Sequence, residues 1–155
     1  MKESIGSTQL FIIVITIILI FAGIMGLTIS RSNAFAIKDS VISAIENNGG
    51  MDLSKEKTSS LSSHDAALDE IVEILATYSY RQKGVCNSGA TGYDRSGKKT
   101  SPSSASAFCI ERISGKMGNN DSFYYKVTIF YTFGLPILAD NLNFTVKGET
   151  KPLYR

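Results

Sequence analysis

The sequence predicts an α+β fold, in which an N-terminal transmembrane helix continues into an amphipathic helix that packs on a small antiparallel β-sheet. Two patterns carry this prediction. A long apolar run without a charged residue lies near the N-terminus, and alternating apolar and polar residues dominate the C-terminal part. The chain has 155 residues, of which 43% are hydrophobic and 19% charged, with a net charge of +2. This length fits one domain with an anchor, and this composition argues against a disordered tail or a multi-span transporter.

The apolar run covers Leu10–Ile29 and has twenty residues, of which sixteen are hydrophobic and four are Thr or Gly. A helix of this length spans about 30 Å, the thickness of the hydrocarbon core of a bilayer. A cleaved signal peptide is the alternative, because Ala34 and Ala36 bracket Phe35 as in a small-x-small cleavage site. The run is longer than the apolar part of a signal peptide, and the helical pattern continues through that site. We therefore expect an uncleaved single-pass anchor.

The helical pattern continues across Ser30–Asn48 as a single apolar stripe. Its members recur at steps of three and four residues: Ala34, Ile37, Val41, Ala44 and Ile45. Asp39 and Glu46 are expected on the opposite side, and the Gly49-Gly50 pair is typical of a helix end. We predict one continuous helix of about 39 residues, whose second half packs on another element through the stripe.

A second amphipathic helix is predicted after a polar connector. Ser62 is the expected N-cap, with Asp65 three residues later as in a loose capping box. The apolar face of this helix has four members: Leu68, Ile71, Val72 and Leu75. The segment Asn87–Ala107 is rich in Ser and Gly, and we expect it to be a loop that contributes nothing to a core.

Three strands are predicted in the C-terminal part, at Phe108–Ile113, at Ser122–Phe133 and around Leu142–Lys147. The sequence GKMGNND between the first two is typical of a hairpin turn. Alternation along the longest strand gives one apolar face: Phe123, Tyr125, Val127, Ile129, Tyr131 and Phe133. Such a face requires a cover, and the helical stripe is the expected partner. The predicted helix–sheet packing residues are Ile37, Val41, Ile45, Tyr125, Val127 and Ile129.

The two cysteines, Cys86 and Cys109, have 22 residues between them in the polar part of the chain. A disulfide between them would indicate an oxidising compartment, whereas two unrelated buried thiols are the alternative. The charges flanking the apolar run do not decide the orientation. Lys2 and the amino terminus on one side carry about as much positive charge as Arg31 and Lys38 on the other. On the strength of the cysteines we assign residues 1–29 to an N-terminal segment with the anchor and 30–155 to an extracytoplasmic domain.

Sites for chemistry are weak in this sequence, and we expect no catalytic residue, cofactor or metal ion. The segment Gly92–Thr100 nearly matches a phosphate-binding loop, but Lys99 stands where Ser or Thr should bind magnesium. His64 is the only histidine, and no zinc, acyl-transfer or thioredoxin-like spacing occurs. Arg95, Lys98 and Lys99 form a basic loop that suits an anionic wall polymer, and it lacks the broader basic face of a nucleic-acid site.

The order of these elements resembles the pilin and pseudopilin architecture, and the tail resembles TadE-like bacterial pilus and secretion components. The resemblance rests on the strand YYKVTIFYTF followed by GLPIL and LNFTVKGETKPL, and it covers residues 6–48 and 122–152. It implies a pilin-like fold. Prepilin processing at Gly6 would place Glu at the fifth mature position, where this chain has Phe11. This departure favours a membrane-resident accessory part or a tip-type subunit over a shaft subunit.

Two functions follow as expectations. The first is a non-enzymatic, membrane-anchored structural component of a pilus-like or secretion assembly in the bacterial envelope. Its partners would be the lipid bilayer and other membrane or assembly proteins. The alternative is an anchored extracytoplasmic binding module that engages cell-wall polymer or a partner protein. Both place the protein in the cell membrane as a single-pass chain, with its N-terminus in the cytoplasm and its C-terminal domain outside.

Overall fold

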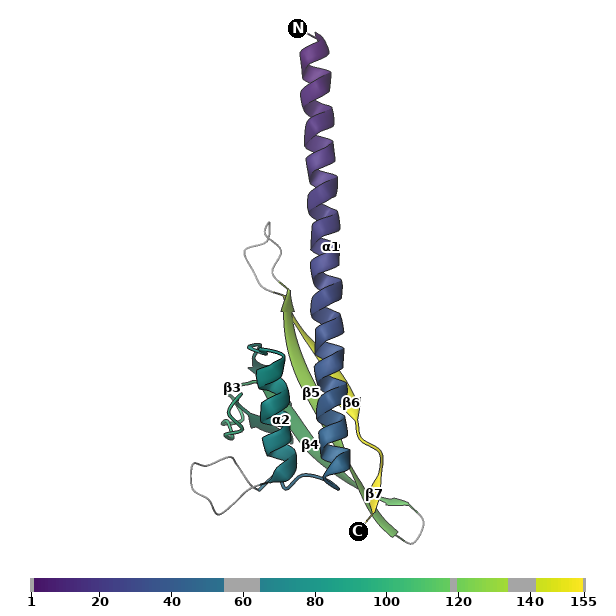
Figure 1. The fold of residues 1–155 in the computed structure, drawn as a ribbon, viewed down its shortest axis with the longest axis vertical. Coiled ribbons are helices and arrows are strands. Elements are labelled where there is room, and N and C mark those ends of the chain that lie inside the picture. The colour runs from purple at the N-terminus through teal and green to yellow at the C-terminus, as the bar shows by residue number, and fades with distance from the viewer. Residues whose placement is uncertain (1, 55–64, 118–119, 134–141, 155) are drawn as a thin grey trace.

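A single long helix organises the fold, as Figure 1 shows. The computed structural model describes residues 2–54, 65–117, 120–133 and 142–154. Helix α1 (Lys2–Asn47) has 46 residues, and its first half projects away from the rest of the molecule. Its second half lies beside helix α2 (Ala66–Thr77) and against an antiparallel sheet. The α+β class that the sequence predicted is therefore confirmed, and α1 is continuous through the Ala34–Ala36 segment.

The sheet contains five strands: β2 (Thr91–Tyr93), β4 (Phe108–Met117), β5 (Asn120–Phe133), β6 (Leu142–Glu149) and β7 (Leu153–Tyr154). Its order is β2-β4-β5-β6, and β7 also pairs with β5, beyond the end of β6. Because β4 and β5 pair along ten residues, the hairpin is longer than the sequence indicated. The predicted turn over residues 115–121 was wrong in its bounds, since Gly115 to Met117 belong to β4. A separate two-stranded sheet joins β1 (Gly84–Val85) to β3 (Ala105–Ser106).

The core lies between the second half of α1, helix α2 and one face of the sheet. All five residues of the helical stripe are buried, with Val41, Ala44 and Ile45 fully enclosed. From β5, the buried side chains on this face are those of Tyr125, Val127 and Ile129. These residues alternate with Lys126 and Thr128, whose side chains lie on the other face and are partly exposed. Burial of each large aliphatic side chain contributes about 1.5–3 kcal/mol, so this interface contributes substantially to the stability of the domain.

Polar contacts hold the end of α1 against the sheet and α2. The chain leaves α1 through Gly49 and Gly50, both at positive φ, as a Gly pair allows. The Tyr125 hydroxyl donates to the Met51 carbonyl oxygen at 2.7 Å and accepts from the Met51 amide at 3.1 Å. The Asn48 side-chain amide donates to Glu70 on α2 at 2.8 Å. The Glu46 carboxylate accepts from the Lys151 amide at 2.7 Å and so links α1 to the segment after β6.

The start of α2 corrects the predicted capping box. The N-cap is Asp65, whose carboxylate accepts from the amides of Ala67 and Leu68, whereas Ser62 lies outside the described residues. The second oxygen of Asp65 accepts from the Asp52 amide at 2.7 Å, so one carboxylate caps α2 and ties it to the segment after α1. Among the predicted apolar residues of this helix, Val72 is only half-buried.

The segment Asn87–Ala107 is the clearest correction to the sequence analysis, because it does contribute to the core. Tyr93 is fully buried and stacks on Phe108 with ring centroids 5.3 Å apart. It reaches this position because β2 pairs with β4 and so joins the sheet. Composition averaged over the segment concealed a single aromatic residue within a run of Ser and Gly. The expectation that this loop adds nothing to a core was therefore wrong.

We predict that a charge at Val41 uncouples α1 from the sheet. The substitution Val41→Asp places a carboxylate among apolar atoms without a partner, which should lower the free energy of unfolding by about 3 kcal/mol or more. Thermal unfolding of the full chain in detergent, followed by the β-sheet circular dichroism signal, measures this loss. Asp39→Asn is the control, since Asp39 is exposed and forms an ion pair with its neighbour Lys38 on the helix surface. Equal melting temperatures for both variants would contradict the docking of α1 on β5.

Candidate functional site

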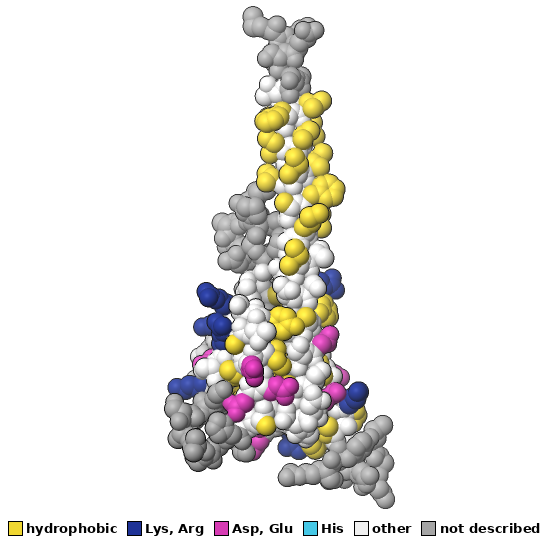
Figure 2. Space-filling view, viewed as in Figure 1, with side chains coloured by type: hydrophobic (Ala, Val, Ile, Leu, Met, Phe, Trp, Pro, Cys, Tyr) yellow, Lys and Arg dark blue, Asp and Glu magenta, His cyan; other side chains and the backbone are white. Residues whose placement is uncertain are grey.

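The exposed half of α1 is the most unusual surface of the molecule. Fourteen large apolar side chains between Leu10 and Ile29 are exposed, with exposed fractions between 41% and 66%. Figure 2 shows apolar side chains along this half of the helix on the face in view. Among the described helices, only this one, over Thr8–Asn47, has the length and apolar composition needed to cross a membrane. A soluble protein rarely exposes so large a contiguous apolar surface without a partner for it.

Cationic and aromatic side chains mark the boundary between this surface and the domain. Phe35 is exposed, and the charged groups of Arg31 and Lys38 lie 5.5 Å and 5.1 Å from the centroid of its ring. Lys38 also forms an ion pair with Asp39 at 2.7 Å, so its charge is matched within the domain. Arg31 is exposed and lies two residues beyond the apolar run. The change from apolar to charged surface therefore occurs within a few residues of Ile29.

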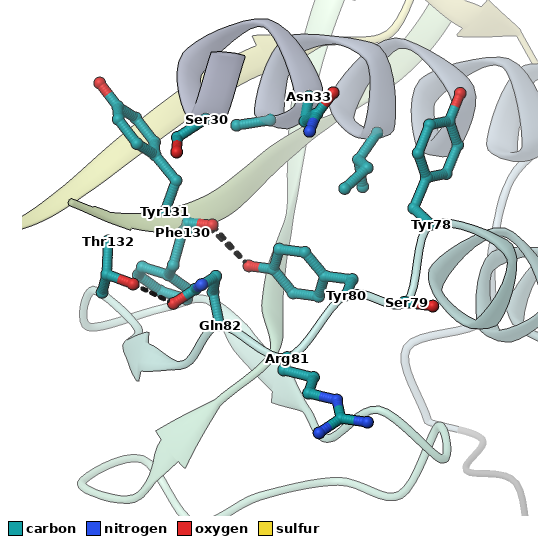
Figure 3. A pocket seen from close by; sticks show the side chains of 12 residues that line it. Ser30, Asn33, Tyr78, Ser79, Tyr80, Arg81, Gln82, Phe130, Tyr131 and Thr132 are labelled. Atoms are coloured by element: carbon teal, nitrogen blue, oxygen red, sulfur yellow. Dashed lines mark hydrogen bonds between the residues drawn. The ribbon is translucent and has the colours of Figure 1, made fainter. Parts of the chain in front are cut away.

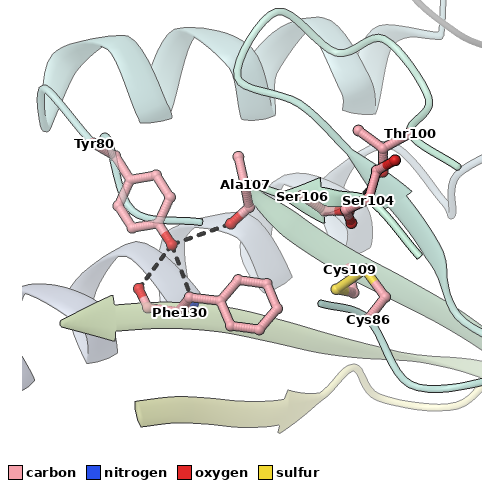
Figure 4. The surroundings of a disulfide bond; sticks show 8 residues. All are labelled: Tyr80, Cys86, Thr100, Ser104, Ser106, Ala107, Cys109 and Phe130. Carbon is pink, nitrogen blue, oxygen red and sulfur yellow. Dashed lines mark hydrogen bonds between the residues drawn. A yellow bond between two sulfur atoms is a disulfide. The ribbon is translucent and has the colours of Figure 1, made fainter. Parts of the chain in front are cut away.

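The two cysteines form a disulfide that fastens the β1–β2 region to the sheet. Cys86 follows β1, and Cys109 is a buried residue of β4. The bond lies beside Gly92, where an added Cβ would overlap the Ser106 hydroxyl and crowd the Cys86 sulfur. Figure 4 shows Ser104, Ser106 and Thr100 on one side of the bond. By closing the chain between residues 86 and 109, the disulfide restricts the unfolded state, a contribution of about 3 kcal/mol.

Tyr80 joins the segment after α2 to the middle of the sheet. Its hydroxyl donates to the Phe130 carbonyl oxygen at 2.7 Å and accepts from the Phe130 amide at 3.0 Å. The Ala107 carbonyl oxygen lies 3.1 Å from the same hydroxyl, as Figure 4 shows. The hydroxyl thus occupies the place where the β4–β5 ladder ends. Burial raises the pKa of Tyr80 far above its usual value, against a smaller lowering by the Phe130 hydrogen bond, so the group stays protonated and remains a donor.

An open cavity of about 290 Å³ separates α1 from the residues around Tyr80. Figure 3 shows Ser30 and Asn33 on α1 facing Tyr131, Thr132 and Gln82 across it. The Thr132 hydroxyl donates to the side-chain oxygen of Gln82, which ties the segment after α2 to β5 a second time. The lining is mixed, with hydroxyl, amide and aromatic groups and no acidic residue among the described residues. No carboxylate, imidazole or thiol lies among the described residues that line this cavity.

The near match to a phosphate-binding loop is a tight turn that uses its own amides. The Asp94 carboxylate accepts from the amides of Ser96 and Lys98, at 2.8 Å and 2.9 Å, and also from the Ser96 hydroxyl. Gly97, at φ 83°, donates its amide to the Asp94 carbonyl oxygen. A phosphate-binding loop needs such amides directed at the ligand. Partial burial tends to raise the pKa of Asp94, but these hydrogen bonds and the Lys98 charge outweigh it and hold the pKa below its usual value.

The other candidate residues gather at no reactive centre. In the described part of the chain, no three His, Cys, Asp or Glu side chains are placed to hold a metal ion. His64 and the GLPIL step lie outside the described residues, and Gly6 lies within α1. The six predicted packing residues meet in one core cluster, in which they are joined by Tyr80 and Tyr93. Sequence reasoning missed these two tyrosines, and their only signal was an aromatic ring in an otherwise polar segment.

We predict that the Tyr80 hydroxyl contributes to the stability of the domain through its hydrogen bonds to Phe130. Tyr80→Phe leaves the Phe130 amide without its partner in a buried place, which should lower the free energy of unfolding by about 1–3 kcal/mol. Urea unfolding of the full chain in detergent provides the measurement. Tyr78→Phe is the matched control, because Tyr78 is 45% exposed and should change stability by less than about 0.5 kcal/mol. If the two variants unfold at the same urea concentration, the hydroxyl does not stabilise the ladder.

Comparison of the chain with protein-family models, with curated proteins and with solved structures gives no match.

Proposed function

We propose that this protein is a non-enzymatic, membrane-anchored structural component of a pilus-like or secretion assembly, with a pilin-like fold of the TadE-like kind. One observation carries the proposal. A single unbroken helix is exposed and apolar through its first half and is docked in a disulfide-bonded domain through its second half. This arrangement couples the position of the domain rigidly to the helix in the bilayer. Such coupling suits a part that holds a folded domain at a fixed place in an assembly.

The proposed orientation places residues 30–155 outside the cytoplasm and the N-terminus inside. The disulfide supports this orientation, because disulfides persist in oxidising compartments and are rare in the cytosol. The apolar half of α1 supports a single crossing, since about twenty apolar residues match the bilayer. A bare helical surface of this kind also offers neighbouring transmembrane helices a place to pack.

A second candidate function is an anchored binding module, and one observation favours it. Arg95, Lys98 and Lys99 lie in a turn that Asp94 holds in a fixed shape. A rigid basic turn outside the membrane suits an anionic wall polymer or a partner protein. The two candidates differ in which surface carries the function: the exposed half of α1 in the first and the basic turn in the second.

We predict that the domain is reached only from outside the cell. In reduced intact cells, a membrane-impermeant thiol reagent should label Cys86, which is half-buried, and unfolding should then expose Cys109 as well. Alkaline extraction of the same cells should leave the chain in the membrane pellet. Labelling that requires permeabilised cells would contradict the orientation. A mature N-terminus beyond Ser30, found by mass spectrometry, would contradict the anchor.

An assembly component should also contact other membrane proteins through the exposed half of α1. A photo-crosslinking residue at Ile24, which is 56% exposed, should give a discrete adduct with a second protein or a second copy in native membranes. The matched position is Asp39, which is exposed on the docked half of the same helix. Adducts from Asp39 alone would contradict the assembly function.

A further inference from the structure

Three exposed basic side chains meet at one groove on the domain. Arg81 and Lys83 follow α2, Arg95 belongs to the basic turn, and together they line a cavity of about 250 Å³. Its remaining lining comes from Tyr80, Gln82 and Ala107. No acidic residue lines this cationic groove among the described residues, and these three cations form no ion pair within the described part of the chain. The groove therefore presents unneutralised positive charge.

Hydrogen bonds hold both backbone segments that carry these cations. The Tyr80 hydroxyl is bonded to Phe130, and Gln82 is bonded to Thr132, so both side chains point toward β5. Alternation along an extended segment then directs Arg81 and Lys83 the other way, and Figure 3 shows Arg81 pointing away from α1. Arg95 lies in the turn whose amides bind the Asp94 carboxylate. Because the support is rigid, a ligand would not have to order the backbone.

The groove lies at the end of the domain that is nearest the apolar half of α1. Residues 80–82 also line the cavity whose other wall is Ser30, Asn33, Ala34 and Ile37 on α1. These α1 residues follow Ile29 by one to eight positions, or by at most about 12 Å along the helix axis. The polar layer of a bilayer is about 5–8 Å thick on each side, and long basic side chains extend toward it. Figure 2 shows some Lys and Arg side chains just beyond the apolar zone, and others farther along the domain among Asp and Glu side chains.

We propose that the cationic groove binds the phosphate of anionic phospholipid headgroups in the leaflet next to the domain. The positive charge of the groove suits phosphate, which Arg binds through paired hydrogen bonds and Lys binds as a point charge. The position of the groove along the axis of α1 favours lipid over a wall polymer. The headgroups of the membrane that α1 would cross lie within reach of the groove. Tyr78, which is exposed at the same end, is an aromatic residue of the kind enriched at membrane interfaces. The inference rests on the proposed anchor, and binding of this kind would hold the domain upright on the membrane.

The test uses the full chain in nanodiscs, with Lys83 as the reporter. One set of discs contains phosphatidylcholine alone, and the other contains one third phosphatidylglycerol. Acetylation of Lys83 by a water-soluble reagent, quantified by peptide mass spectrometry, is compared with acetylation of Lys147, which is exposed on β6. We expect the Lys83-to-Lys147 ratio to fall about threefold or more in the anionic discs and to recover in high salt. An unchanged ratio in chain that is inserted in the discs overturns the proposal, while the anchor then still stands.

Two variants with equal net charge separate this groove from general attraction to an anionic surface. Arg81→Gln with Arg95→Gln removes two groove cations and keeps the Lys83 reporter. Arg112→Gln with Lys151→Gln removes the same charge from exposed residues that do not line the groove. We expect the first pair to abolish the lipid-dependent protection of Lys83 and the second pair to retain it. Equal protection in both pairs overturns the proposal.

A third experiment distinguishes lipid headgroups from a soluble phosphate polymer as the ligand of the groove. Soluble polyphosphate is added to chain in phosphatidylcholine discs at the phosphate concentration of the anionic lipid. The lipid assignment predicts that Lys83 stays as reactive as without the polymer. Protection by the soluble polymer equal to that by anionic lipid overturns the assignment to headgroups and favours a wall-polymer site.

Discussion

The packing of one helix face on one strand face supports every other feature of this protein. Val41 and Ile45 of α1 lie in the same cluster as Val127 and Ile129 of β5, and all four side chains are fully buried. Because α1 is continuous, this contact fixes the projecting half of the helix with respect to the sheet. An anchor joined by a flexible linker would leave the domain free to rotate. Here the orientation of the domain follows from the buried interface.

Tyrosine hydroxyls complete this interface where the apolar contacts end. Tyr125 binds both polar backbone groups of Met51 and so fixes the exit from α1, and Tyr80 does the same for Phe130 at the end of the β4–β5 ladder. Each ring lies in the core while its hydroxyl meets backbone groups that would otherwise be buried without partners. The disulfide acts at a third point, holding the short strands β1 to β3 against the sheet. The face of the sheet away from α1 is partly covered in this way, since Phe130 is buried beside Gly84.

The proposed roles divide the molecule along the axis of α1. In the proposal, its exposed apolar half is the anchor and the surface for other transmembrane helices, and the domain beyond Ile29 carries charge and hydrogen-bonding groups. The cationic groove takes its basic residues from two separate segments of the chain. Arg95 belongs to the turn, and it shares the groove with Arg81 and Lys83, which come from the segment after α2. The groove is thus a product of the fold, and so is its position near the apolar run.

The sequence by itself determined the features that depend on local periodicity: the apolar run, the stripe through Val41, the alternation along β5 and the helix stop at Gly49-Gly50. These patterns are legible because one face of each element must avoid water, which imposes a period of 3.6 or 2 residues. Contacts between distant residues leave no such pattern. The hydrogen bonds of Tyr80, the burial of Tyr93 within a Ser-rich segment, the capping of α2 by Asp65 and the meeting of Arg81 with Arg95 each depend on where the folded chain brings two segments together. Only the tertiary structure decided them, because a single polar or aromatic residue acquires its role from its neighbours in space.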